Sequence, residues 1–288
     1  MFKVISWLPL SVLYRFSFLI YVLTYKIFRY RINVVKENIQ NCFSTMSRKE
    51  QRRIISSFYR NLSDVVVEIL KAPSIKKEEL EKRVKMKNME LPLSYHEKGI
   101  PVICLTGHLC NWEWLLMACS LHTPYSIDAV YKPMHIAWME KLFRYTRSRF
   151  GARLLPMRDV LKAVIRNKAE IKAIAMVADQ IPPEAEIQYF TNFLNQNTAF
   201  FVGGDKLAKY MNAPVLFVDM KRIKKGYYEI EFISLTENAE QDLPSFPITE
   251  SYARQLEKRI LASPQDWLWT HRRWKHKTWK WEKQTVPR

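Results

Sequence analysis

Glycine is scarce in this 288-residue chain, which contains only 6. Neither a GxGxxG fingerprint nor a Walker A loop occurs, which argues against a glycine-rich nucleotide-binding loop. The 4 cysteines form no CxxC pair and no zinc spacing, so a reducing compartment fits better than a disulfide framework. Internal repeats and low-complexity tracts do not stand out. A hydrophobic share of 48% is too high for a disordered chain.

Acidic residues are also few relative to basic ones. The chain has 28 Asp and Glu against 46 Lys and Arg, a formal net charge of +18. Such a chain favours anionic partners, which include nucleic acid, anionic lipid, phosphorylated substrates and acidic proteins.

The N-terminal segment is apolar from residue 4 to residue 27 and reads "VISWLPLSVLYRFSFLIYVLTYKI". Its length is close to the roughly 20 residues that span a bilayer, but Arg15 in its middle is costly in hydrocarbon. The segment therefore fits either a tilted spanning helix or a helix in the membrane interface. The cations at its C-terminal end, Lys26, Arg29 and Arg31 with Lys36, outnumber the lone Lys3 before it, which by the positive-inside rule leaves the rest of the chain in the cytoplasm. We expect residues 1–30 to be a membrane anchor.

Strand and helix patterns alternate through the rest of the chain. Buried strand runs are predicted at 101–107, 127–131 and 171–179, with helices from Ser47, at 111–120, 135–150 and 159–168. This alternation predicts a single α/β domain over residues 31–288, with a mostly parallel central sheet flanked by helices. Residues 180–199 are expected to form a loop.

The stretch "GHLCNWEW" at residues 107–114 carries the densest chemistry. His108 and Glu113 are five positions apart, so they point away from each other on a regular helix. They can meet if His108 lies in the turn after a strand and Glu113 in the first turn of the next helix, with Asn111 as its N-cap. Glu113 then fixes the imidazole tautomer, and His108 acts as a general base toward a hydroxyl.

Other interpretations of this stretch stay open on the residues alone. A zinc site lacks further ligands at tight spacing. Cys110 as a nucleophile needs a base and a lowered pKa, to which a helix N-terminus contributes. A histidine satisfied in a structural turn is the plain alternative, and it is the expected one for an isolated His-x4-Glu.

Further motifs change that balance. "YKP" at 131–133, "RSRFGARLLPMRD" at 147–159, "ADQ" at 178–180 and "PQDWLWTHRRWK" at 264–275 follow His108-x4-Glu113 in order. Together with the apolar N-terminus, the chain resembles the late acyltransferases of lipid A biosynthesis, within the lysophospholipid acyltransferase superfamily. The resemblance covers essentially the whole chain, and its tryptophan-rich C-terminal motif is the most specific part.

The resemblance implies an O-acyltransferase that moves a fatty acyl chain from acyl carrier protein to a hydroxyl of a lipid A precursor. It places the enzyme on the cytoplasmic face of the inner membrane, against an anionic membrane surface, with no metal, no cofactor, no covalent intermediate and no nucleic-acid partner. His108 and Glu113 match the family's catalytic pair. The residues implied to bind or shape the substrate site are Lys132, where the family pattern has an arginine, and Arg149, Arg158, Asp179 and Gln180.

The basic residues support the same interpretation from their chemistry. Arginines at 147, 149, 153 and 158 form a cluster in sequence, and guanidinium groups suit bidentate phosphate contacts, although a solvated basic face is the usual alternative. Five of the nine tryptophans lie in the last 22 residues and interleave with cations, a composition that favours the membrane interface, while Trp267 and Trp269 are expected to pack. A different class, a non-catalytic membrane protein that binds anionic lipid or nucleic acid, is the second hypothesis.

Overall fold

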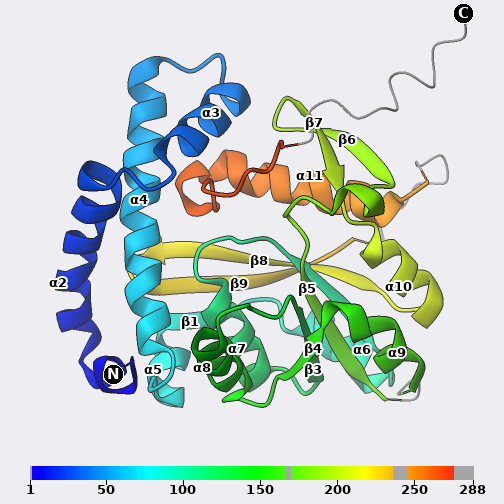
Figure 1. The fold of residues 1–288 in the computed structure, drawn as a ribbon. Coiled ribbons are helices and arrows are strands. Elements are labelled where there is room, and N and C mark those ends of the chain that lie inside the picture. The colour runs from blue at the N-terminus through cyan, green and yellow to red at the C-terminus, as the bar shows by residue number, and fades with distance from the viewer. Residues whose placement is uncertain (1, 167–169, 236–244, 276–288) are drawn as a thin grey trace, which may run out of the picture.

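A seven-stranded sheet forms the centre of the computed structural model, which describes residues 2–166, 170–235 and 245–275 (Figure 1). The strand order is β1-β9-β8-β2-β5-β3-β4. Its strands are β1 (Val84–Met86), β2 (Val102–Thr106), β3 (Ser126–Tyr131), β4 (Arg153–Pro156), β5 (Lys172–Val177), β8 (Val215–Lys224) and β9 (Tyr227–Ser234). All neighbours pair in parallel except β8 and β9, which form an antiparallel hairpin. The prediction of a mostly parallel sheet flanked by helices is confirmed.

Helices cover both faces of the sheet, as the apolar strand runs require. On β2, Ile103 and Leu105 belong to the core shared with α10 (Gly203–Met211) and α11 (Pro247–Ala262). Val102 points to the opposite core, which contains α7 (Trp112–His122). Smaller helices complete the layers around β1, α7 and β4: α5 (Lys77–Arg83), α6 (Glu90–Glu97), α8 (Ala137–Ser148) and α9 (Val160–Arg166).

The N-terminal segment packs along the side of the domain (Figure 1). After α1 (Phe2–Trp7), Pro9 precedes α2 (Leu10–Tyr21), which runs into the π-helical η1 (Val22–Ile27). The long α4 (Arg48–Lys71) lies beside α2 and begins with the capping box that its sequence predicts, in which Ser47 and Glu50 bond each other's backbone amides. Between them, α3 (Ile32–Cys42) leads the chain over the top of the molecule.

The predicted loop at 180–199 is wrong for its second half. A two-stranded antiparallel sheet forms there from β6 (Tyr189–Phe193) and β7 (Gln196–Phe200). Its turn consists of Leu194 and Asn195, both at positive φ, of 52° and 61°. A two-residue hairpin turn of this type requires positive φ at both positions, and its usual sequence signature is Asn-Gly. The Leu-Asn sequence found here does not indicate such a turn. The remaining short elements are the 3-10 turns η2 (Met157–Asp159), η3 (Glu184–Glu186) and η4 (Pro264–Asp266).

Candidate active site

The connection from β2 to α7 carries the candidate general base. Residues 107–111 form it and are called the His108 turn from here on. Gly107 allows the turn to pack closely on α11, because a Cβ there would lie 2.8 Å from Leu256 Cδ1 and would force that side chain to move. Asn111 caps α7 as predicted, since its side-chain oxygen accepts from the Trp114 amide at 3.0 Å. Cys110 has a φ of 50°, a left-handed conformation that is strained for a side chain of this kind.

Asp179 is the partner of the His108 imidazole. β5 lies beside β2 in the sheet, so the residues that follow both strands meet at the same edge. The Asp179 Oδ1 atom is 2.6 Å from His108 Nδ1, and Oδ2 accepts from the His108 amide at 2.9 Å. Trp267 Nε1 donates to the same Oδ2 at 2.7 Å. The carboxylate is therefore fixed by three donors, and Asp179 is only 2% exposed.

The two groups shift each other's titration. Burial alone would raise the pKa of Asp179, but the His108 charge and the hydrogen bonds outweigh it and hold that pKa at about 2. Burial alone would lower the pKa of His108, and the Asp179 carboxylate, with a smaller effect of Glu113, raises it above its ordinary value. An ionised Asp179 on Nδ1 assigns the neutral imidazole its proton at Nδ1, which leaves Nε2 as the acceptor.

The expected hydrogen bond between Glu113 and His108 is wrong. Glu113 lies in the first turn of α7 as predicted, but its carboxylate meets Arg147 on α8. Arg147 donates to it twice, from Nη2 at 2.6 Å and from Nε at 2.9 Å. Glu113 acts on the imidazole only through space. The spacing of the motif does not reveal these pairings, because the partner of Glu113 lies on α8 and the partner of His108 follows β5, both distant in sequence.

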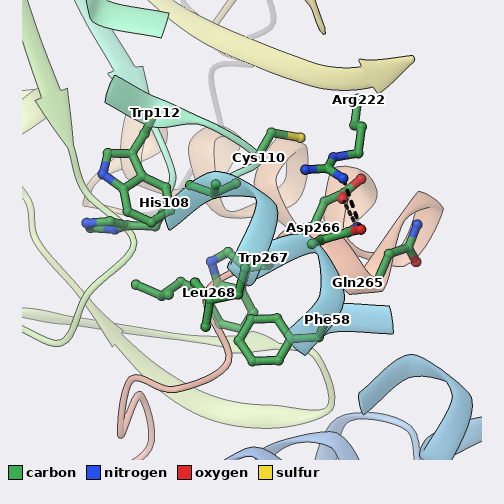
Figure 2. A pocket seen from close by; sticks show the side chains of 12 residues that line it. Phe58, His108, Cys110, Trp112, Arg222, Gln265, Asp266, Trp267 and Leu268 are labelled. Carbon is green, nitrogen blue, oxygen red and sulfur yellow. Dashed lines mark hydrogen bonds between the residues drawn. The ribbon is translucent and has the colours of Figure 1, made fainter. Parts of the chain in front are cut away.

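A small, partly open cavity lies between His108 and helix α4 (Figure 2). His108 and Trp112 stand at one end of it, with ring centroids 5.1 Å apart in an edge-on arrangement. Arg222 and Asp266 stand at the other end. Gln180 brings its amide nitrogen to 3.4 Å from His108 Nε2, a contact that fits an Nε2 acceptor. The imidazole thus lines one end of a small cavity, and Nε2 is its free acceptor atom next to Gln180.

The other residues expected to bind substrate do not lie together around one site. Asp179 contacts His108 and Trp267, which gives it an orienting place instead of a substrate contact. Arg149 donates to the Ala72 carbonyl at 2.6 Å and stacks over Phe150. Both remaining residues, Lys132 and Arg158, are exposed to solvent, and the Arg158 side chain is 84% exposed.

The basic cluster seen in the sequence is partly neutralised in space. Arg147 pairs with Glu113, and Arg153 pairs with Asp128 and Glu170, each at 2.6 Å. These arginines therefore stabilise the fold around β3, β4 and α8 before any ligand arrives. Of the four, Arg158 is the most exposed, and its only close ion pair among the described residues is with Asp159 at 3.7 Å.

Tryptophans of the C-terminal motif pack inward. The indole of Trp267 holds Asp179, Trp269 donates to the Pro264 carbonyl at 2.6 Å, and Trp274 donates to Thr198 at 2.8 Å. The membrane-interface expectation is wrong for Trp274, which is 6% exposed. Trp279 and Trp281 lie outside the described residues. The C-terminal motif thus lines the site and contributes one hydrogen bond directly to its carboxylate, a role that sequence reasoning missed.

Comparison with known families gives the chemistry. A model of the family described as bacterial lipid A biosynthesis acyltransferase matches residues 1–276. The chain belongs to this family. The protein is therefore an acyltransferase of lipid A biosynthesis, and the resemblance seen in its motifs is confirmed.

Two relatives show how far this acyltransferase has diverged. It is 22% identical over 250 residues to the lipid A biosynthesis palmitoleoyltransferase of Escherichia coli, which covers 85% of this chain and 79% of the relative. A lipid A biosynthesis acyltransferase of Shigella flexneri matches with the same identity and coverage.

The Cys110 thiol of this acyltransferase is poorly suited to act as a thiolate nucleophile. The side chain is buried, and burial raises the pKa of its thiol well above the ordinary value. Its sulfur donates to the Met220 carbonyl at 3.2 Å. Cys110 is therefore a packing residue of the His108 turn, although it lines the cavity together with His108.

Proposed function

We propose that the protein transfers a fatty acyl chain from an acyl carrier protein thioester to a hydroxyl of a lipid A precursor, with His108 as general base. The observation that carries this proposal is the imidazole that lines the cavity, whose Nδ1 is held by buried Asp179 so that Nε2 is left as the acceptor. The pair has the geometry of a histidine and aspartate that activate a hydroxyl. The acceptor lipid supplies the hydroxyl.

The proposed step transfers one proton and exchanges one bond. Nε2 of His108 takes the proton of the acceptor hydroxyl while its oxygen attacks the thioester carbon. The carbon–sulfur bond breaks, the new oxygen–carbon bond forms an ester, and the imidazolium returns the proton to the departing sulfur. Asp179 stabilises the imidazolium in between, while the nearby Glu113 carboxylate favours the imidazolium charge and its partner Arg147 opposes it, neither of them bonded to the ring.

Charge supports the choice of donor and acceptor. Acyl carrier protein is acidic and a lipid A precursor carries phosphate, and both suit a chain of net charge +18. Lys132 and Arg158 are exposed cations that follow β3 and β4, and we assign them to phosphate or acyl carrier protein contact.

The N-terminal helices support a position on the membrane surface. The stretch Leu10–Ile27 is long and apolar enough to cross a bilayer, with 22% of it buried. Its outer face carries exposed apolar side chains, among them Phe18 at 63% and Ile27 at 59%. Arg15 and Lys26 on the same exposed side fit anionic lipid headgroups.

We infer that α2 lies in the plane of one leaflet and does not cross the bilayer. Its inner face is bonded to α4, through Ser17 to Asp64 at 2.7 Å and Tyr21 to Ser56 at 2.9 Å. A crossing α2 would take α4 into hydrocarbon with it, and α4 carries several charges near its start and middle: Arg48, Lys49, Glu50, Arg52, Arg53, Arg60 and Asp64. An interfacial helix avoids this cost.

Acyl transfer is tested with purified protein, acylated acyl carrier protein and a lipid A precursor, with products measured by mass spectrometry. We expect His108→Ala to lose activity by at least about 10³-fold while the circular dichroism spectrum is unchanged. His122→Ala, at the other end of α7, is the matched control and keeps activity. Full activity of His108→Ala contradicts the proposal.

Membrane placement is tested with Trp7→Cys, at a residue that is 77% exposed just before α2. An impermeant maleimide applied to intact spheroplasts labels this thiol if α2 crosses the membrane. An in-plane helix leaves it unlabelled until the cells are opened, and early labelling refutes the in-plane position.

A further inference from the structure

A buried carboxylate stands behind the His108 turn. Glu68 on α4 is 0% exposed, yet it accepts three hydrogen bonds from three different parts of the chain. Its Oε2 accepts from Asn111 Nδ2 at 2.8 Å and from the Tyr228 hydroxyl at 2.6 Å. Its Oε1 accepts from the Tyr14 hydroxyl of α2 at 2.7 Å. One side chain therefore joins α2, α4, β9 and the end of the His108 turn.

Asn111 is the point where this carboxylate meets the site. The Asn111 side chain uses its oxygen to cap α7 and its nitrogen to bond Glu68, so both ends of the amide are fixed. The residue follows strained Cys110, whose amide is held by the Asp266 carbonyl at 2.8 Å. It precedes Trp112, which packs on the His108 ring. A turn with a left-handed residue keeps its shape only when its surroundings hold it.

We propose that Glu68 is a positioning residue, which holds the His108 turn through Asn111 and links it through Tyr14 to the lipid-facing helix α2. This inference rests on the proposed function, because its effect is read in acyl transfer. Glu68 itself touches neither the His108 ring nor the cavity. A shift of α2 on the lipid surface changes the Tyr14 bond and, through it, the orientation of Asn111.

The charge around Glu68 suits such a link. Burial raises the pKa of Glu68, while the Arg222 guanidinium and the three donors oppose that rise. Arg222 in turn bonds the Tyr228 hydroxyl at 3.1 Å and pairs with Asp64 at 3.2 Å. Removal of the Tyr14 hydroxyl leaves Oε1 without its donor in a buried site, whereas Oε2 keeps one donor if either Asn111 or Tyr228 is lost.

A pair of tyrosine variants tests the link from α2. Tyr14→Phe and Tyr21→Phe each remove one hydroxyl that joins α2 to α4, but only Tyr14 bonds Glu68, since Tyr21 bonds Ser56. We expect Tyr14→Phe to lower kcat about fivefold or more with KM unchanged, measured on precursor-containing vesicles. Tyr21→Phe keeps kcat, and thermal unfolding checks that both variants are folded at the assay temperature. Equal kcat values in the two variants overturn the inference.

A compensating pair tests the contact with Asn111. Aspartate caps helices as well as asparagine does, so Asn111→Asp preserves the cap, but it sets a second carboxylate against Glu68. We expect its kcat to fall about 100-fold and the double variant Asn111→Asp/Glu68→Gln to recover to within about fivefold of wild type, because the glutamine amide donates to the new carboxylate. A fully active Asn111→Asp, or a double variant without recovery, overturns the inference.

The outcomes separate the two proposals. A wild-type protein without acyl transfer contradicts the proposed function and says nothing against the contacts of Glu68. An active wild type with equal Tyr14→Phe and Tyr21→Phe contradicts the positioning role alone. If Asn111→Asp does not fold, the tyrosine pair still decides, because each loses a single hydroxyl.

Discussion

Replacing Asp179 by asparagine tests the orientation of the general base directly. Two of the three donors to Asp179, the His108 amide and Trp267 Nε1, meet the same atom, Oδ2. Both are obligate donors, so the asparagine oxygen must take the Oδ2 place. Its NH2 group then faces His108 Nδ1 at the 2.6 Å contact. The ring responds by moving its proton to Nε2, which removes the acceptor that the hydroxyl needs.

The expected loss is large because the tautomer and the imidazolium partner change together. A misoriented tautomer in a histidine and aspartate pair lowers kcat on the order of 10⁴-fold, which is about 5.5 kcal/mol of barrier. Folding stability falls as well. The pKa of Asp179 is lowered from 3.8 to about 2, so its ionised form stabilises the fold by about 2 to 3 kcal/mol. This stability is present above the ordinary pKa and is lost as pH falls through about 2.

The assay is the pH profile of kcat/KM, with circular dichroism to show that the variant is folded. The activity of wild type rises with pH through the pKa of His108, which Asp179 raises above its ordinary value. In Asp179→Asn the residual activity rises at lower pH. Glu113→Gln is the comparison, since Glu113 does not touch the ring. If Asp179→Asn keeps more than a tenth of wild-type activity while Glu113→Gln abolishes it, the assignment of Asp179 is refuted.

Three further predictions follow from contacts of the described residues. Arg147→Ala leaves buried Glu113 unpaired, so urea unfolding shows a loss of about 3 to 5 kcal/mol; a loss under 1 kcal/mol contradicts this. Cys110→Ala stays within about threefold of wild-type activity, because its thiol is buried and protonated; an inactive variant revives the thiol mechanism. Phe18→Glu weakens flotation with phosphatidylglycerol vesicles about tenfold, whereas Leu161→Glu, exposed on α9, does not; equal binding of both contradicts the lipid face.

Much of the fold follows from local pattern. The strands at 102–106 and 172–177, the cap at Asn111 and the capping box at Ser47 all depend on residues close in sequence, and periodicity and side-chain chemistry reveal them. The β6–β7 hairpin was not predicted, because Leu194 in its turn has a positive φ and leucine is not a residue that indicates such a conformation. Residue propensities predict a turn poorly when the pairing of the flanking strands determines its backbone conformation.

The sequence by itself determined that a histidine stands after a strand, that a carboxylate opens the next helix, and that the motifs belong to the lipid A acyltransferases. Only the tertiary structure decided which carboxylate the histidine meets. Strand order sets β5 beside β2 and so brings Asp179 to His108, while α8 brings Arg147 to Glu113. Hydrogen bonds form between neighbours in space, and neighbours 71 residues apart in the chain carry no spacing rule that a motif can express.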